Sequence, residues 1–205
     1  MLTLAIQAGG ESRRMGRDKA LLPFLGEPMI VRLLNRLARI ADEVLVTSNR
    51  PEDYRFLGLT PIPDLLPGFG ALGGLYTALN AAGNPYVAVV ACDMPFASPE
   101  LFAVELAILR DSGADAVIPR SEAGTEPFHA IYRRDTCLPF VRSALDAGKR
   151  RVDAWFSQVK IHYLAEPETL PYDQDRLAFL NINTLDELKK AEQVANEGKG
   201  LDHPE

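Results

Sequence analysis

An apolar run that ends in a glycine turn and a cluster of cations constrains this chain more than any other stretch. Residues 2–6 have the composition of a strand buried on both faces of a parallel sheet. The turn and the cations follow at once, as Gln7, Ala8, Gly9, Gly10, Arg13, Arg14, Arg17 and Lys19. Glycines let a ligand approach main-chain N–H groups, and these four cations within seven residues contrast with a net charge of -6. The stretch indicates an anion site, most simply for a polyphosphate; the alternative is a surface turn with solvated arginines.

The familiar phosphate-binding motifs do not fit this stretch. A P-loop needs Gly-Lys-Ser/Thr at a set spacing, and a dinucleotide fingerprint needs Gly-x-Gly-x-x-Gly at the start of a helix. Residues 8–19 instead resemble the signature Leu-Ala-Gly-Gly-x-Ser-x-Arg-Met-Gly-x-Asp-Lys of nucleotidyltransferases with a glycosyltransferase-A-like fold, and are most similar to the molybdenum cofactor guanylyltransferases. Gln7 departs from the usual Leu, at a position that contributes mainly backbone. The resemblance extends to about Ala195.

Length and composition limit the remaining possibilities. With 205 residues and 47% hydrophobic content, we expect one domain over residues 1–196 and a disordered polar tail over 197–205. Cys92 and Cys137 have no Cys or His partner at ligand spacing, which argues against a disulfide framework or a zinc site. The sequence has no membrane-length apolar run, no signal-peptide pattern and no broad basic tract. We therefore expect a cytoplasmic protein that binds neither membrane nor nucleic acid.

Strands and helices are expected to alternate along the chain. Apolar runs predict strands at residues 2–6, 43–48, 59–63, 86–91, 115–119 and 126–132, and helical spacing or capping signals predict helices at 28–40, 72–82 and 99–111. This alternation is typical of a three-layer α/β/α sandwich with a mostly parallel, Rossmann-like sheet and right-handed crossovers. The resemblance adds the glycosyltransferase-A-like nucleotidyltransferase fold.

Polar residues follow several of these strands at their carboxyl ends, where open parallel sheets bind ligands. They are the Gln7 turn, Thr47, Asn49, Asp64 and Asp93. Asp93 ends the most apolar strand, and a carboxylate there suits Mg²⁺, which takes one or two carboxylates plus substrate phosphates. The alternative is an aspartate that caps the turn at Pro95. The resemblance implies that Asp93 coordinates the magnesium bound to the nucleotide.

Asp64 is a candidate for contacting the nucleotide base. A carboxylate can accept two hydrogen bonds from the donor edge of guanine, although an aspartate before a Pro-Gly turn is ordinary. The resemblance implies nucleotide contacts for both Asp64 and Thr47. Because the family more often carries Asn at the latter position, Asn49 is an alternative to Thr47.

The second half of the chain offers candidates for binding the acceptor. The resemblance implies that the strand with His129 borders the pterin substrate; the alternative is a neutral histidine hydrogen-bonded at a sheet edge. Arg150 and Arg151, beside Lys149, either bind the acceptor phosphate or lie at a helix C-terminus without a ligand.

An Asn-x-Asn-Thr element near the C-terminus completes the candidate site. Asn181 and Asn183 are expected on one face of a strand, and the resemblance places this element by the metal, with Asn183 favoured as a second metal-side ligand. Thr184 and Glu187 form a capping box, which explains both residues without a role in binding.

These parts combine into one predicted reaction. The glycine turn with Arg13, Arg17 and Lys19 holds the triphosphate of GTP, and Mg²⁺ on Asp93 bridges phosphate oxygens. The terminal phosphate of molybdopterin then attacks the α-phosphorus, with Lys19, Arg13 and Asp93 as catalytic residues. Alternatives are a cytidylyltransferase for the same cofactor, another small-phosphate nucleotidyltransferase, and a non-catalytic nucleotide-binding or cofactor-delivery protein. Other cofactor-biosynthesis or acceptor proteins are expected partners.

Overall fold

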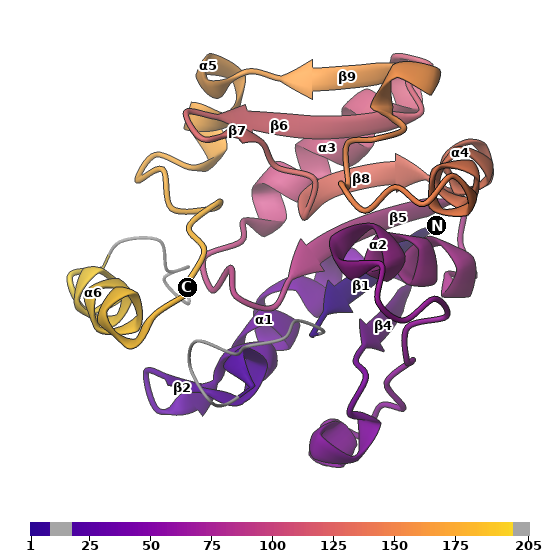
Figure 1. Ribbon diagram of the computed structural model, residues 1–205. Helices are drawn as coiled ribbons and strands as arrows, with labels where there is room; N and C mark the ends of the chain where they lie inside the picture. Colours follow the sequence, from indigo (N-terminus) through magenta and orange to yellow (C-terminus); the bar gives the residue numbers. More distant parts are fainter. Residues whose placement is uncertain (9–17, 199–205) are drawn as a thin grey trace.

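The computed structural model describes residues 1–8 and 18–198 and consists of one mixed sheet with helices on both faces (Figure 1). Its seven strands are β1 (Leu2–Gln7), β4 (Glu43–Thr47), β5 (Tyr86–Ala91), β6 (Ala116–Ser121), β7 (Gly124–Thr125), β8 (His129–Arg133) and β9 (Ile161–Leu164). A separate hairpin is formed by β2 (Pro23–Phe24) and β3 (Glu27–Pro28). The α-helices are α1 (Met29–Leu37), α2 (Gly70–Ala81), α3 (Pro99–Asp111), α4 (Arg134–Asp146), α5 (Glu166–Thr169) and α6 (Leu185–Asn196).

The sheet has the order β4-β1-β5-β8-β6-β7, with β9 paired to β6. The first three strands are parallel, and Gln7 lies in register with both Thr47 and Ala91. β8 runs antiparallel to both of its neighbours, and β9 runs parallel to β6. The prediction of a mostly parallel α/β sheet is confirmed. The carboxyl ends of β1, β4 and β5 therefore meet at one edge of the sheet, termed the carboxyl edge.

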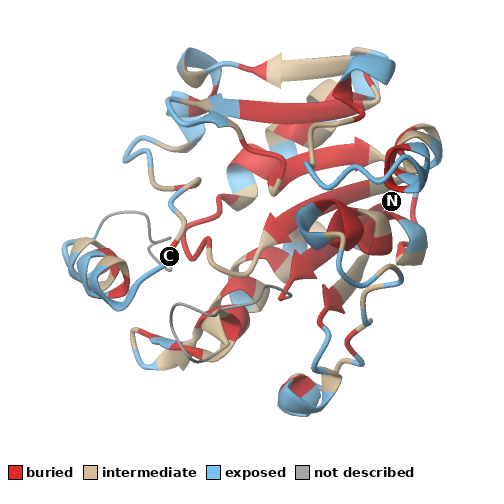
Figure 2. Cartoon of the chain, viewed as in Figure 1, coloured by how far each residue is buried: buried red, intermediate tan, exposed pale blue. Residues whose placement is uncertain are grey.

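Two hydrophobic clusters cover the two faces of the sheet. Leu4 and Ile6 of β1 pack with residues of α1 and α3, whereas Ala5 packs with residues of α2 and α4. Successive side chains of a strand point to opposite faces, so a strand covered on both faces must be apolar throughout, and all six residues of β1 are buried. Figure 2 shows this buried central layer between more exposed helices. The three-layer α/β/α architecture is confirmed.

Two expected strands differ in the structure. The strand expected over residues 59–63 is reduced to a single bridge between Ile62 and Thr47, because Pro61 and Pro63 have no N–H to donate to a ladder. The strand expected over 126–132 begins only at His129. Helix α3 follows the expectation closely, and the hydroxyl of Ser98 accepts a hydrogen bond from the Leu101 N–H as its N-cap.

The chain returns to the carboxyl edge of the sheet after β9. The N–H of Ile182 donates to the carbonyl of Asp93, at 2.9 Å. Helix α6 then packs Leu188 and Ala191 against Phe24 of the β2–β3 hairpin. Of the tail expected to be disordered, 199–205 lie outside the described residues. In the described part of the chain, no helix is long and apolar enough to cross a membrane.

Candidate active site

Lys19, Asp93 and Asn183 come together at the carboxyl edge, from three distant parts of the chain. The Lys19 ammonium donates to Asp93 Oδ2 at 3.1 Å and to Asn183 Oδ1 at 2.7 Å. Lys19 begins a short 3-10 turn, Asp93 follows β5, and Asn183 precedes α6. The side chains of Lys19 and Asp93 are 19% and 18% exposed, so the pair is partly shielded but open to a ligand. The structure thus brings together three of the residues that the sequence predicted to be in the site.

Asp18 fixes the turn that carries Lys19. Its Oδ1 accepts a hydrogen bond from the Ala20 N–H at 3.1 Å, as the N-cap of the turn, and its Oδ2 accepts one from the Tyr54 hydroxyl at 2.7 Å. Tyr54 is buried, and burial, with the neighbouring Asp18 carboxylate, raises the pKa of its phenol. The hydroxyl therefore stays protonated and acts as a donor. Sequence reasoning missed Tyr54, because it lies in the polar segment Pro51–Leu57 that resembles an ordinary surface turn.

Asn183 is positioned by the predicted capping box of α6. The N–H groups of Asn183 and Thr184 donate to Glu187 Oε2 at 2.6 and 3.0 Å, and the Glu187 N–H donates to the Thr184 hydroxyl. These charge-assisted hydrogen bonds lower the pKa of the Glu187 carboxyl. The capping box is confirmed, and it also fixes the residue whose side chain contacts Lys19.

The prediction that Asn181 and Asn183 share one strand face is wrong. Residues 181–183 form no strand, because the N–H groups of Ile182 and Asn183 donate to Asp93 and Glu187 instead of to a neighbouring strand. The Asn181 amide donates to the Phe179 carbonyl at 3.1 Å. Of the two asparagines, Asn183 is therefore the one that contacts Lys19.

Asn49 and Asp64 form a second polar pair near the end of β4. Asn49 Nδ2 donates to Asp64 Oδ2 at 2.8 Å, and the Asp64 N–H donates to Asn49 Oδ1 at 2.9 Å. Thr47 is buried at 1% exposure, and its carbonyl accepts a hydrogen bond from the Ala8 N–H at 2.9 Å. Of the two residues that sequence reasoning weighed for a nucleotide contact, Asn49 is exposed and Thr47 is not.

Gln7 contributes more than the expected backbone. Its carbonyl accepts from the Cys92 N–H at 3.0 Å, and its largely buried amide leaves Nε2 without a hydrogen-bond partner among the described residues. A Cβ on Gly74 of α2 would lie 2.8 Å from Gln7 Oε1, so glycine at that position makes room for the amide. Gly9, Gly10, Arg13 and Arg17, which the sequence also placed in this site, lie outside the described residues.

The three candidates for acceptor binding are placed differently from one another. His129 is buried, its ring nitrogens contact Ser98 and Glu105, and burial lowers the pKa of its imidazole to about 3. This is the neutral, hydrogen-bonded histidine of the alternative interpretation, although it lies on the internal strand β8 and not at a sheet edge. Arg150 is exposed, and Arg151, 84% exposed, forms an ion pair with Asp153 at 2.7 Å.

A pocket of about 510 Å³ lies between the β6–β7 hairpin and the segment that follows β9. Its walls include two arginines, four carboxylates, an aromatic ring and an amide, from Arg120, Arg176, Glu122, Glu126, Glu166, Asp173, Phe179 and Asn181. Asn181 lines the pocket and is two residues from Asn183 in the chain, so the pocket and the cluster of Lys19, Asp93 and Asn183 both use the segment between β9 and α6. Its walls combine charged and apolar groups, which suits a flat polar heterocycle.

The oxygens around Lys19 also fit a divalent metal. Asp93 Oδ2 and Asn183 Oδ1 converge on one cation, the Lys19 ammonium, and carboxylate and amide oxygens are ligands that Mg²⁺ prefers. Among the described residues, no group of three or more His, Cys, Asp or Glu side chains could hold a metal by itself. Mg²⁺ bound here would take its remaining ligands from phosphates and water.

Comparisons with known proteins show the family to which the chain belongs. A model of the MobA-like NTP transferase domain matches residues 4–161. A probable molybdenum cofactor guanylyltransferase of Pelotomaculum thermopropionicum is 36% identical over 197 residues, covering 96% of this chain and 95% of that protein. The molybdenum cofactor guanylyltransferase of Desulfosudis oleivorans is 32% identical, with 97% and 98% covered.

A solved structure shows the same architecture at full length. Molybdopterin-guanine dinucleotide biosynthesis protein A from Archaeoglobus fulgidus superimposes with a TM-score of 0.83 at 26% identity, over 95% of this chain and 99% of that one. The family model covers the segment that carries Lys19 and Asp93, and the relatives extend the match over nearly the whole chain. This chain belongs to the family of the MobA-like NTP transferase domain and is a nucleotidyltransferase.

Proposed function

We propose that this protein transfers GMP from GTP to the terminal phosphate of molybdopterin and releases pyrophosphate. The observation that carries the proposal is the Lys19 ammonium between Asp93 Oδ2 and Asn183 Oδ1. It lies at the carboxyl edge, and Lys19 is the last residue of the segment that resembles the family signature. Membership of the MobA-like family and the similarity to molybdenum cofactor guanylyltransferases support this choice of substrates.

Lys19 has the central role in binding the triphosphate. Its ammonium binds phosphate oxygens, and Asp18 and Tyr54 hold its turn in position. Gly9, Gly10, Arg13 and Arg17 complete the phosphate site in the proposal, with Arg13 as a second catalytic cation. Asp93 and Asn183 are the residues that would hold Mg²⁺, which when bound neutralises charge on the phosphates.

The transfer itself requires positioning and no covalent protein nucleophile. A phosphate oxygen of molybdopterin attacks the α-phosphorus in line, and the bond from that phosphorus to the bridging oxygen of pyrophosphate breaks. The cations stabilise the charge that shifts onto the leaving pyrophosphate, which is how preorganised charges accelerate such reactions.

The other polar groups at the carboxyl edge are proposed to bind the nucleoside part of GTP. Asp64, held by Asn49 at 2.8 Å, offers carboxylate oxygens to the N1–H and N2–H₂ groups of guanine. The Gln7 amide, which has an unpaired Nε2 within the described residues, is a further donor to the nucleotide. Ala8 and Thr47 contribute through the backbone that joins the ends of β1 and β4.

The acceptor is assigned to the pocket between the β6–β7 hairpin and residues 166–181. This pocket is open and lies beside Asn181, whereas the ring of His129 is fully buried. Arg150 and Arg151 are exposed cations, and their contact with the acceptor phosphate stays a prediction.

Product analysis with three nucleotides tests the proposal. The purified protein is incubated with Mg²⁺, molybdopterin and GTP, CTP or UTP, and pyrophosphate and the dinucleotide product are quantified. We expect equal amounts of pyrophosphate and guanine dinucleotide, with GTP only. Efficient turnover of CTP would replace the named donor and favour a cytidylyltransferase. Binding of GTP without release of pyrophosphate would favour a non-catalytic carrier.

A further inference from the structure

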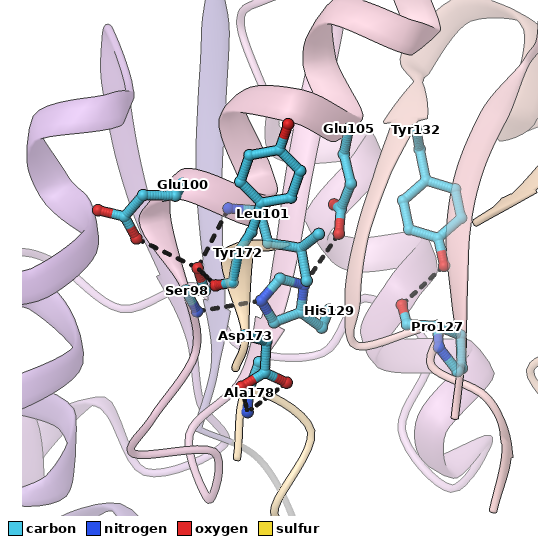
Figure 3. A network of polar contacts seen from close by, with 10 residues as sticks. All are labelled: Ser98, Glu100, Leu101, Glu105, Pro127, His129, Tyr132, Tyr172, Asp173 and Ala178. Carbon is cyan, nitrogen blue, oxygen red and sulfur yellow. Dashed lines mark hydrogen bonds and ion pairs between the residues drawn. The ribbon is translucent and has the colours of Figure 1, made fainter. Parts of the chain in front are cut away.

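Figure 3 shows a polar network around the buried His129, which includes Ser98, five residues after Asp93 in the chain. The Ser98 N–H donates to His129 Nε2 at 3.2 Å, and His129 Nδ1 lies 3.0 Å from Glu105 Oε1. The imidazole stacks on the ring of Phe102, with centroids 4.0 Å apart and planes 4° apart. The side chains of His129 and Glu105 are fully buried. No step of the proposed reaction uses these groups.

The directions of these hydrogen bonds determine the tautomer of the His129 imidazole. Because Nε2 accepts the Ser98 N–H, it carries no hydrogen, and a neutral imidazole must then carry its hydrogen on Nδ1. His129 Nδ1–H therefore donates to Glu105 Oε1. Ser98 is the N-cap of α3, and an N–H at a helix start has no intrahelical partner. His129 supplies the acceptor that this N–H would otherwise lack.

The turn that begins at Asp93 and ends at Ser98 is attached at both ends to the segment after β9. At one end, the Asp93 carbonyl accepts from the Ile182 N–H at 2.9 Å. At the other, the Ser98 hydroxyl lies 3.1 Å from the Tyr172 carbonyl and 3.2 Å from Glu100 Oε2, the two acceptors that share its one hydrogen. Between these two links, the ring of Phe179 packs edge-on against His129, with centroids 5.2 Å apart.

We infer that His129 is a positioning residue, which sets the place of the Asp93 carboxylate by accepting the Ser98 N–H. Asp93 enters the turn directly after β5, and Ser98 ends it at the start of α3. The Asp93 end of the turn is held because it continues the buried strand β5. The hydrogen bond from the Ser98 N–H to His129 Nε2 holds the other end. The inference rests on the proposed role of Asp93 at the metal. This role also explains why β8 carries a polar residue, His129, on the face that packs against apolar residues of α3 such as Phe102.

The test measures the Mg²⁺ concentration that gives half-maximal GTP binding by the full-length protein. His129→Phe keeps an aromatic ring on Phe102 but removes the acceptor, and we expect it to raise this concentration about fivefold, as for one lost hydrogen bond. His129→Gln, whose amide oxygen can accept the Ser98 N–H, should restore the value to within about twofold. Circular dichroism and urea unfolding confirm that each variant is folded.

Tyr132→Phe is the matched control. Tyr132 is also buried on β8, and its hydroxyl donates to the Pro127 carbonyl at 2.7 Å. The side chain belongs to the cluster on the opposite face of the sheet, away from the turn. The variant should therefore lose a comparable buried hydrogen bond and keep the wild-type Mg²⁺ dependence. An equal shift in Tyr132→Phe and His129→Phe would overturn the inference, as would no shift in His129→Phe.

Two further variants keep the result decisive. If His129→Phe does not fold, His129→Met removes the ring acceptor with a more adaptable apolar side chain and leaves the Ser98 N–H in place; it should raise the Mg²⁺ requirement, and a wild-type value would overturn the inference. Asp93→Ala separates this inference from the proposed function. If Asp93→Ala leaves the Mg²⁺ dependence unchanged, the metal assignment fails; if only His129→Phe and His129→Met leave it unchanged, the positioning role alone fails.

Discussion

The ammonium of Lys19 lies 3.1 Å from the carboxylate of Asp93, across 74 positions of sequence. The parallel pairing of β1 and β5 creates this contact, because it aligns the ends of both strands at one edge of the sheet. The pair is mostly but not fully buried, so phosphate oxygens can replace the carboxylate as partners of the ammonium. In the proposed reaction, the ammonium that forms this ion pair is also the cation that binds the phosphates.

Replacement of Lys19 should affect turnover far more than stability. Lys19→Ala removes the cation that binds the phosphates, and we expect kcat to fall by about 10²- to 10³-fold, as when one preorganised charge stabiliser is lost. The free energy of unfolding should change by less than about 1 kcal/mol, because a partly exposed ion pair contributes little. Lys190→Ala, on the exposed side of α6, is the control for net charge. Near-normal turnover in Lys19→Ala would remove its assigned role.

Tyr54 should matter for both stability and nucleotide binding. Tyr54→Phe leaves Asp18 Oδ2 without its 2.7 Å donor, and we expect a loss of about 1–2 kcal/mol in the free energy of unfolding. The turn of Lys19 is then held less firmly, so the KM for GTP should rise. Tyr76→Phe, whose hydroxyl has only a 3.4 Å contact with Arg142, should change neither quantity, as urea unfolding and initial rates can show. Equal behaviour of both variants would contradict the account.

Glu105 should give the protein a measurable pH dependence. Burial raises the pKa of its carboxyl well above 4.5, and Oε2 has no partner among the described residues. Above that pH the unfolded chain loses the proton while the folded protein keeps it, so wild-type stability falls as pH rises. Glu105→Gln removes this loss and keeps an acceptor for His129 Nδ1–H.

The variant should therefore gain stability relative to the wild type as pH rises above 4.5. The gain is up to about 1.4 kcal/mol per pH unit while the native carboxyl stays protonated. Urea unfolding of both proteins at several pH values between 5 and 8 measures it. A difference that does not change with pH would mean that Glu105 is ionised in the folded protein.

Much of the fold could be predicted from sequence because the relevant signals are local. The apolar run that became β1 and the Ser98-Pro99 start of α3 each specify their own conformation. The expected strand at 59–63 failed because Pro61 and Pro63 lack the N–H that a ladder needs. Asn181 and Asn183 alternate like a strand, yet the backbone of their segment is bound to Asp93 and to the α6 cap.

The candidate site was only partly predictable, because some of its parts depend on contacts distant in sequence. The roles of Lys19 and Asp93 follow from their motifs and strand ends. Nothing near Tyr54 in the sequence indicates Asp18, which is 36 positions away. Likewise, the burial of His129 depends on helix α3 and on the segment after β9, and the order of residues in its own strand does not reveal it.

Calorimetric titration of GTP, with Mg²⁺ and with EDTA, into the wild type and Asp93→Ala tests the central claim most directly. The cluster of Lys19, Asp93 and Asn183 predicts that GTP binds the wild type in the presence of Mg²⁺. EDTA should weaken this binding by at least about tenfold, because it removes the metal that the Asp93 carboxylate would hold. In Asp93→Ala, binding should already be weak and should no longer respond to EDTA. If Asp93→Ala binds GTP with wild-type affinity and the same response to EDTA, the proposed phosphate and metal site is contradicted.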